Sequence, residues 1–217
     1  MTRLKIDFVS DIVCPWCVVG LGALRAALAQ HPTVTAEIVF HPFELNPAMP
    51  REGQNVVEHV AEKYGATPEQ SANNRQRIRD AAAAFGFAMN GDASSRIYNS
   101  FDAHRLLDWA RGAGRQAALK DVLFRAYFTD RADISDPDQL VAAAGESGLD
   151  RAEAAAILAS DAHADAVRHA EAYWHAQGIA AVPSIIFDDR YLVQGAQPVE
   201  VFDRVIRKLT QAQAATA

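Results

Sequence analysis

The sequence predicts an α/β protein that opens as β-α-β, continues as a long helical block and closes as β-β-α. Strand-like alternation of apolar and polar residues occurs near both ends of the chain, and helical periodicity fills the part between them. Alanine, the strongest helix former, makes up about a fifth of the residues. Of the 217 residues, 50% are hydrophobic and 22% are charged, which is enough apolar material for a hydrophobic core.

The opening segments predict two parallel strands joined by a helix. Residues 4–9 alternate between apolar and polar and then become wholly apolar, as expected of a strand that enters a core. A helical pattern runs from about Trp16 to Gln30, and Pro15 suits its first position because a proline there loses no hydrogen bond. Residues 34–40 form the second predicted strand. A connection through a helix makes the two strands parallel, with a right-handed crossover.

The middle of the chain predicts an insertion built only of helices. Three prolines interrupt residues 41–50, and almost no strand pattern occurs from about residue 55 to residue 178. Thr67 and Asp136 each precede a proline, which is typical of a helix start. The expected helices span residues 54–64, 68–86, 100–112, 115–128, 137–147, 150–159 and 161–177.

The closing segments predict a hairpin followed by a helix. Residues 184–187 and 191–193 are short apolar runs separated by a turn, so they form an antiparallel pair. An amphipathic helix is expected from Gln197, with its apolar stripe at Val201, Phe202, Val205, Ile206 and Leu209.

These elements divide the chain into two predicted domains. Residues 1–47 and 178–217 form one discontinuous α/β domain, and residues 48–177 form the inserted helical domain. The two halves of the discontinuous domain must meet to complete one sheet, so the ends of the insertion are expected to lie close together.

Charge and hydropathy exclude several classes of function. Lys and Arg total 21 and Asp and Glu total 27, so the formal net charge is −6, and runs of basic residues suited to nucleic acid do not occur. Charged residues at positions 3, 5, 7 and 11 interrupt the N-terminal segment, so it has no continuous apolar stretch like that of a secretory leader. No segment approaches the roughly 18 apolar residues of a membrane helix. We therefore expect a cytoplasmic protein that binds neither nucleic acid nor membranes.

Cys14 and Cys17 are the only cysteines, and they lie three residues apart. A structural zinc site needs four ligands, and no histidine pattern supplies the others, so we expect no metal. The reactive form of cysteine is the thiolate, which the start of a helix favours. The spacing places Cys17 one turn further along the same helix face. We predict that Cys14 is the exposed nucleophile and that Cys17 resolves the mixed disulfide formed on Cys14.

Several spaced motifs together carry a family resemblance. They are Ser10-Asp11 before Cys14-Pro-Trp-Cys17, Phe43-Glu-Leu-Asn-Pro47, the segment from Asn99 to Leu106, Val182-Pro-Ser184 and Gly195-Ala-Gln-Pro198. The sequence resembles the DsbA-family thioredoxin-fold oxidoreductases, specifically the FrnE-like branch, from residue 4 to about 209. The resemblance implies a thioredoxin-like fold with a large all-helical insertion. It also implies thiol–disulfide exchange that needs no cofactor.

The resemblance also implies roles for residues outside the dithiol motif. A Val-Pro bond is usually trans, but the equivalent proline of the family is cis, so Pro183 is expected to be cis and to face Cys14. The backbone of Val182 would then pair with an extended substrate segment. His104 and Asn99 are expected near the cleft as substrate-binding residues.

Two residues between the cysteines, Pro15 and Trp16, are expected to contact the substrate as well. The substrate is a protein or small-molecule thiol or disulfide, and the direction of exchange is open, because a reducing compartment favours the dithiol. The substrate's identity, the redox potential, the recycling partner and the oligomeric state are open as well.

Two other classes of function compete with exchange. The first is a glutathione-dependent isomerase or transferase of the kappa-class or 2-hydroxychromene-2-carboxylate isomerase type, with glutathione as co-substrate. Such proteins resemble this architecture but carry serine in place of Cys14 and lack the second cysteine. The second is a non-catalytic peptide-binding or holdase module, which would keep its function without either cysteine.

Overall fold

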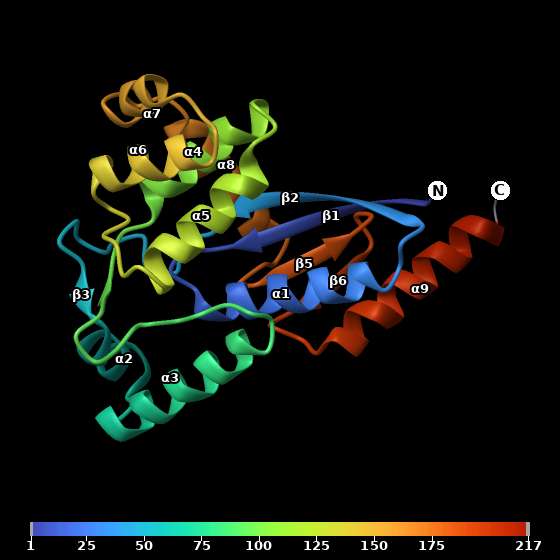
Figure 1. Ribbon diagram of the computed structural model, residues 1–217, viewed down its shortest axis with the longest axis horizontal. Helices are drawn as coiled ribbons and strands as arrows, with labels where there is room; N and C mark the ends of the chain where they lie inside the picture. The colour runs from blue at the N-terminus through green and yellow to red at the C-terminus, as the bar shows by residue number, and fades with distance from the viewer. Residues whose placement is uncertain (1, 216–217) are drawn as a thin grey trace.

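The computed structural model describes residues 2–215, and its main sheet joins strands from both ends of the chain (Figure 1). The strand order is β2-β1-β5-β6. The central strand β1 (Thr2–Ser10) is parallel to β2 (Val34–Pro42) and antiparallel to β5 (Ser184–Phe187). The edge strand β6 (Tyr191–Gln194) pairs antiparallel with β5. The predicted β-α-β and β-β-α halves therefore form one sheet.

One face of the sheet is covered by α1 (Pro15–Ala29) and α9 (Val199–Ala215), which pack against each other (Figure 1). Phe8 of β1 belongs to this core, together with Leu24 of α1 and Phe202 of α9, and all three are fully buried. Burial of a side chain of this size contributes about 1.5–3 kcal/mol. This core fixes α1, and with it the cysteines, against the sheet.

A second set of helices packs on β2. The helices α4 (Phe101–Gly112), α5 (Gln116–Phe128) and α8 (Ala164–Ala176) each contact this strand. The helices α6 (Pro137–Glu146) and α7 (Arg151–Leu158) complete the group by packing on α4 and on each other. These helices enclose a core of their own, with Leu106, Leu119 and Leu123 at its centre.

The remaining helices, α2 (Val56–Tyr64) and α3 (Pro68–Ala83), begin at residues whose side chains cap them. Asn55 accepts hydrogen bonds from the first turn of α2, and Gly65 ends that helix with a φ of 66°. Thr67 and Gln70 form a reciprocal capping box at the start of α3. The packing of α3 against α1 attaches this part of the insertion to the cysteine helix.

The prediction of an all-helical insertion is wrong in one detail. The short strand β3 (Gln54–Asn55) pairs antiparallel with β4 (Arg96–Ile97). Strands of two residues show no alternation that could distinguish them from a helix, and α2 consequently begins at Val56 rather than at residue 54.

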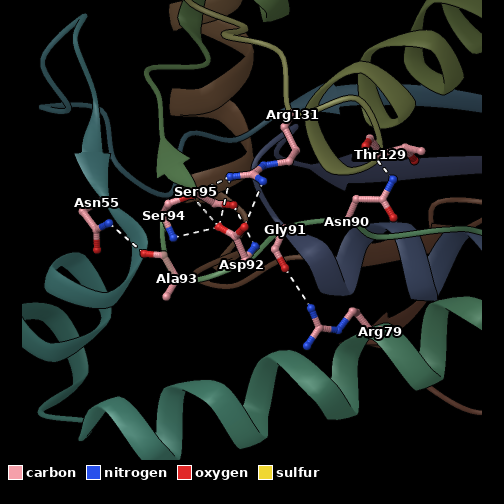
Figure 2. Close-up of polar contacts among 10 residues, drawn as sticks. All are labelled: Asn55, Arg79, Asn90, Gly91, Asp92, Ala93, Ser94, Ser95, Thr129 and Arg131. Carbon is pink, nitrogen blue, oxygen red and sulfur yellow. Dashed lines mark hydrogen bonds and ion pairs between the residues drawn. The ribbon is translucent and has the colours of Figure 1, made fainter.

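Besides the short strand β4, side-chain contacts hold the segment between α3 and α4 (Figure 2). Two nitrogens of Arg131 donate to the Asp92 carboxylate at 2.9 and 3.0 Å. Arg79 of α3 donates to the Gly91 carbonyl at 2.8 Å. Asn55 donates to the Ala93 carbonyl at 2.9 Å. These contacts tie α3, β3 and the loop after α5 together.

Other differences from the expected elements lie at their ends. The helix α8 begins at Ala164 rather than at residue 161, and α9 begins at Val199 rather than at Gln197. The domain boundaries after residues 47 and 177 stay a prediction. Within residues 2–215, no helix has the length and apolar character needed to cross a membrane.

Candidate active site

Cys14 occupies the N-cap position of α1. Its backbone is extended, and Pro15 occupies the first helical position. The Cys14 side chain makes no capping hydrogen bond, so its sulfur remains at the positive end of the helix. Cys17 lies one turn further, where its N–H donates to the Cys14 carbonyl at 3.1 Å. Both thiols are free, and their order along the helix matches the predicted roles.

Burial distinguishes the two thiols less than the sequence predicts. Cys14 is 4% exposed and Cys17 is 0% exposed, so the prediction of an exposed Cys14 is wrong, although Cys14 is the more accessible of the two. The cover over Cys14 comes from the loop around Val182, which sequence spacing alone does not place. Burial first, and then the neighbouring Cys14, raise the pKa of the Cys17 thiol.

The loop that contains Val182 and Pro183 lies against the Cys14 sulfur. The peptide bond between these two residues is cis, and the Cys14 thiol donates to the Val182 carbonyl at 3.7 Å. Pro183 is buried, whereas Val182 is partly accessible. A Cβ atom on Gly20 of α1 would lie 2.9 Å from Pro183 Cγ, so the glycine permits the close approach of the loop.

Asp11 organises the turn that leads from β1 to the motif. Its carboxylate is fully buried and accepts a hydrogen bond from Leu45 N at 2.7 Å. The carbonyl of Asp11 accepts the Cys14 N–H at 3.3 Å. Burial opposes ionisation of this carboxyl, but the His104 imidazole and other polar neighbours outweigh it and lower the pKa of Asp11. Asp11 is therefore a buried anion, and its backbone carbonyl, not its carboxylate, accepts the N–H of Cys14.

The structure buries His104, whereas Asn99 is partly exposed. His104 of α4 is 2% exposed, and its Nε2 lies 3.4 Å from an Asp11 carboxylate oxygen. It therefore reaches the motif through Asp11, and the substrate contact predicted for it is wrong. Asn99 accepts the Phe101 N–H at 2.9 Å and donates to the Met49 carbonyl at 3.1 Å, which positions the start of α4. The substrate-binding role of Asn99 stays a prediction.

Residues around the Cys14 sulfur provide accessible surface. Pro15, Trp16 and Val182 are each partly exposed, as a substrate-contacting role requires. Tyr64, at the end of α2, is 66% exposed. Burial and then the charge of Cys14 raise the pKa of Tyr64.

Lys120 is a residue near the motif that the sequence analysis did not identify. It is 0% exposed on α5, and its Nζ has no hydrogen-bond partner among the described residues. Its Nζ lies 4.6 Å from the centre of the Phe124 ring. Burial lowers the pKa of Lys120 to about 8, against the opposing effect of Cys17. The available signal was helical spacing, because Lys120 lies on the same stripe as the buried Leu123.

The arrangement provides two sulfurs as its reactive groups. Over residues 2–215, no three His, Cys, Asp or Glu side chains are grouped so that they could hold a metal ion. Cys14 can form a disulfide bond with another sulfur. Cys17 lies one helical turn away, from where it can attack the Cys14 sulfur and break that bond. The pair belongs to a hydrophobic core cluster that also includes Phe8, Val18 and Leu24.

Comparisons with known proteins agree with this geometry. An uncharacterised protein of Bacillus subtilis (strain 168), YwbO, is 29% identical over 206 residues, covering 94% of this chain and 96% of YwbO. A probable DsbA oxidoreductase from Streptomyces coelicolor is similar in structure, with a TM-score of 0.90 and 37% identity. That alignment covers 97% of this chain and 90% of the other.

Two more distant solved structures share the fold alone. A 2-hydroxychromene-2-carboxylate isomerase has a TM-score of 0.69 at 17% identity, covering 98% of this chain and 99% of its own. The cytosolic disulfide reductase DsbM of Pseudomonas aeruginosa has a TM-score of 0.63 at 18% identity, covering 98% of this chain and 100% of its own. DsbM has also been solved with GSH.

A family model covers nearly the whole chain. The model for the DSBA-like thioredoxin domain matches residues 5–207, which include the sheet, the dithiol helix and the complete helical insertion. The match includes Cys14, Cys17 and Pro183, and it agrees with the fold of the solved relatives. The chain belongs to the DSBA-like thioredoxin domain family.

Proposed function

We propose that this protein is a thiol–disulfide oxidoreductase of the FrnE-like branch, in which Cys14 is the nucleophile and Cys17 the resolving thiol. The observation that carries the proposal is the position of the Cys14 sulfur at the start of α1, 3.7 Å from the Val182 carbonyl oxygen. Cys17 is placed behind it and is fully buried. A substrate disulfide that approaches from solvent therefore meets Cys14 first.

Exchange proceeds through one mixed disulfide. The Cys14 thiolate attacks one sulfur of the substrate disulfide, and the other sulfur leaves as a thiolate. Cys17 loses its proton and attacks the Cys14 sulfur, which releases the second substrate thiolate. The products are a Cys14–Cys17 disulfide and a reduced substrate, and the reverse sequence oxidises a dithiol.

Substrate binding is assigned to the partly exposed surface around the sulfur. The backbone at Val182 borders Cys14 directly and can pair with an extended chain. Trp16 and Pro15 add partly exposed apolar area beside it. This surface suits a disulfide carried by an unfolded or extended polypeptide, and glutathione is a smaller thiol that the same site would accept.

Trapping of the mixed disulfide tests this function. Cys17→Ser keeps the nucleophile and removes the resolving thiol, so it should accumulate covalent adducts with disulfide substrates. Cys14→Ser is the matched control and should accumulate few. The measurement is non-reducing electrophoresis followed by mass spectrometry of the adducts, and adducts absent from both variants would refute the exchange mechanism.

The same variants separate the competing classes of function. A glutathione-dependent isomerase or transferase would retain its activity in Cys17→Ser, because its reaction has no resolving step. A holdase would retain its activity when both cysteines are replaced by serine. The two free cysteines favour exchange over both alternatives.

The direction of exchange and the cellular location belong to this proposal as well. We place the protein in the cytoplasm, where a glutathione-linked reductase or isomerase is the expected role. Titration of the Cys14–Cys17 pair against reduced and oxidised glutathione gives its potential. A potential near that of glutathione or below it supports a reductase, and a much higher one supports an oxidant. Cell fractionation tests the location.

A further inference from the structure

We propose that Lys120, contributed by the helical insertion, stabilises the Cys17 thiolate during the resolving step. This inference rests on the proposed exchange function and adds a positioning residue to it. Cys17 is fully buried, and a buried thiolate without a nearby cation is costly to form. The resolving step therefore needs a positive charge in the same buried region as Cys17.

Lys120 has the placement that this role needs. It lies on α5, which packs on β2, and its side chain is fully buried. Its Nζ lies 5.8 Å from the centre of the Phe40 ring and 4.6 Å from that of Phe124, so aromatic faces hold the ammonium group. Within residues 2–215 no hydrogen bond satisfies this nitrogen. A buried ammonium that no hydrogen bond uses is unexpected unless its charge has a role.

Phe40 and Phe124, whose rings hold the ammonium group, belong to the same hydrophobic core cluster as Cys14 and Cys17. Among the charged groups that act on the Lys120 pKa, Cys17 has the largest effect. The opposing effects on its pKa come, in order, from Cys17, Asp11, Cys14 and Asp121. Lys120 also lines a cavity of about 40 Å³ between β2 and the helices. The titratable groups around that cavity are His41, His104, Asp108 and Arg111. The interaction is mutual, since the charge of Lys120 opposes the rise in the Cys17 pKa.

The proposed step conserves atoms and charge. In the mixed disulfide, Cys17 gives its proton to solvent and becomes a thiolate beside the Lys120 ammonium. The thiolate attacks the Cys14 sulfur, the bond from Cys14 to the substrate sulfur breaks, and its electron pair leaves with the substrate thiolate. Lys120 stays protonated throughout and is unchanged by the reaction.

A competing explanation is that Lys120 only balances the buried Asp11 carboxylate. Asp11 already accepts the Leu45 N–H at 2.7 Å and has the His104 imidazole beside it. Under that explanation, removal of the ammonium would weaken the fold and leave the relative rates of the two chemical steps unchanged. The two explanations therefore predict different effects of this removal on the ratio between the rates of the two chemical steps.

The test uses 5,5′-dithiobis(2-nitrobenzoate) with the reduced full-length protein. The attack of Cys14 releases one coloured thiolate, and the attack of Cys17 on the mixed disulfide releases a second. Stopped-flow absorbance resolves the two releases over a range of pH. Lys120→Met keeps the shape of the side chain without its charge, and Lys120→Arg keeps the charge. Leu119→Met is the packing control, because it changes a buried neighbour of Lys120 on α5 without changing any charge or aromatic ring.

We expect Lys120→Met to slow the second release about tenfold more than the first near neutral pH, and to shift the pH midpoint of the second release upward. Leu119→Met should leave the ratio of the two rates within twofold of the unmodified protein, and Lys120→Arg should stay close to it. An unchanged ratio and pH midpoint in Lys120→Met would overturn the role of Lys120 alone. Failure of the unmodified protein to release either thiolate would instead overturn the exchange function.

Discussion

The thiol of Cys14 donates a hydrogen bond to the carbonyl of Val182, which lies 168 residues further along the chain. The contact joins the helix after the first strand to the loop before β5. Both segments are fixed by the same central strand, because β1 precedes the cysteine motif and pairs with β5. The relative positions of the nucleophile and the substrate-binding backbone are therefore set by the sheet.

Alkylation should distinguish the two thiols. Cys14 is 4% exposed and Cys17 is 0% exposed, and the raised pKa of Cys17 further reduces its reactive thiolate fraction. We expect iodoacetamide to modify Cys14 first in the native protein, with Cys17 modified only as the protein unfolds. Peptide mass spectrometry over a time course provides the measurement. Modification of Cys17 before Cys14 would reverse their assigned roles.

Gly20→Ala should displace the loop at Pro183. The added Cβ would lie 2.9 Å from Pro183 Cγ and 3.6 Å from the Ala196 backbone, so the loop or the helix must shift. We expect a loss of about 1–3 kcal/mol in the free energy of unfolding and a slower exchange reaction. Gly112→Ala is the matched control, because a Cβ there meets no atom within 4 Å. Equal behaviour of the two variants would show that the loop tolerates the displacement.

Asp11→Asn should lower stability in a pH-dependent way. The pKa of Asp11 is lowered from its ordinary value of 3.8, so its ionised form stabilises the folded state. This contribution is complete above about pH 4 and is lost as the pH falls through the lowered pKa of the folded state. We expect a deficit of about 1–3 kcal/mol in the variant at pH 7 that shrinks at lower pH. Urea unfolding at several pH values measures it, and a deficit that does not change with pH would exclude the charge as its cause.

Lys120→Met should stabilise the protein at neutral pH. The pKa of Lys120 falls from 10.5 to about 8 on folding, so the folded state binds fewer protons between these values. The destabilisation is complete below pH 8, amounts to about 3 kcal/mol, and is relieved as the pH rises towards 10.5. We expect urea unfolding of the Lys120→Met variant to show a gain of about 1–3 kcal/mol at pH 7.

The raised pKa of Cys17 makes stability fall as the pH rises, which is opposite to the effect of Lys120 over part of the same pH range. Its contribution is lost as the pH rises above the unfolded value of 9.0. The pH series is therefore best compared in a Cys17→Ser background, with and without Lys120→Met. A stability curve that rises equally with pH in both proteins would show that Lys120 does not titrate in this range.

The element order could be predicted from the sequence because each main strand and helix carries its own periodicity. Cys14 and Cys17 were identifiable for a similar reason, since a helix start and a spacing of three residues are local features. The pairing of β3 with β4 could not be predicted, because it joins two pairs of residues that are 41 positions apart at Asn55 and Arg96. Contacts across such a distance depend on the packing of the insertion.

For the site residues outside the motif as well, local features could be predicted from the sequence and long-range packing could not. The resemblance brings His104 into the region of the motif, but its burial against Asp11 depends on how α4 packs on β2. Lys120 was missed because a lysine within an amphipathic helix usually faces solvent. Only the packed structure shows that Lys120 is buried, with its Nζ against the rings of Phe40 and Phe124.

The placement of β5 next to β1 has a consequence for synthesis on the ribosome. Both cysteines emerge before the carbonyl that contacts Cys14 and the strand β5, which follow only at residues 182–187. A nascent chain therefore carries its dithiol without the bordering loop while the 168 residues from Cys14 to Val182 are made. Completion of the hairpin of β5 and β6 is the event that assembles the site, which delays its specific chemistry until the whole helical insertion has been synthesised.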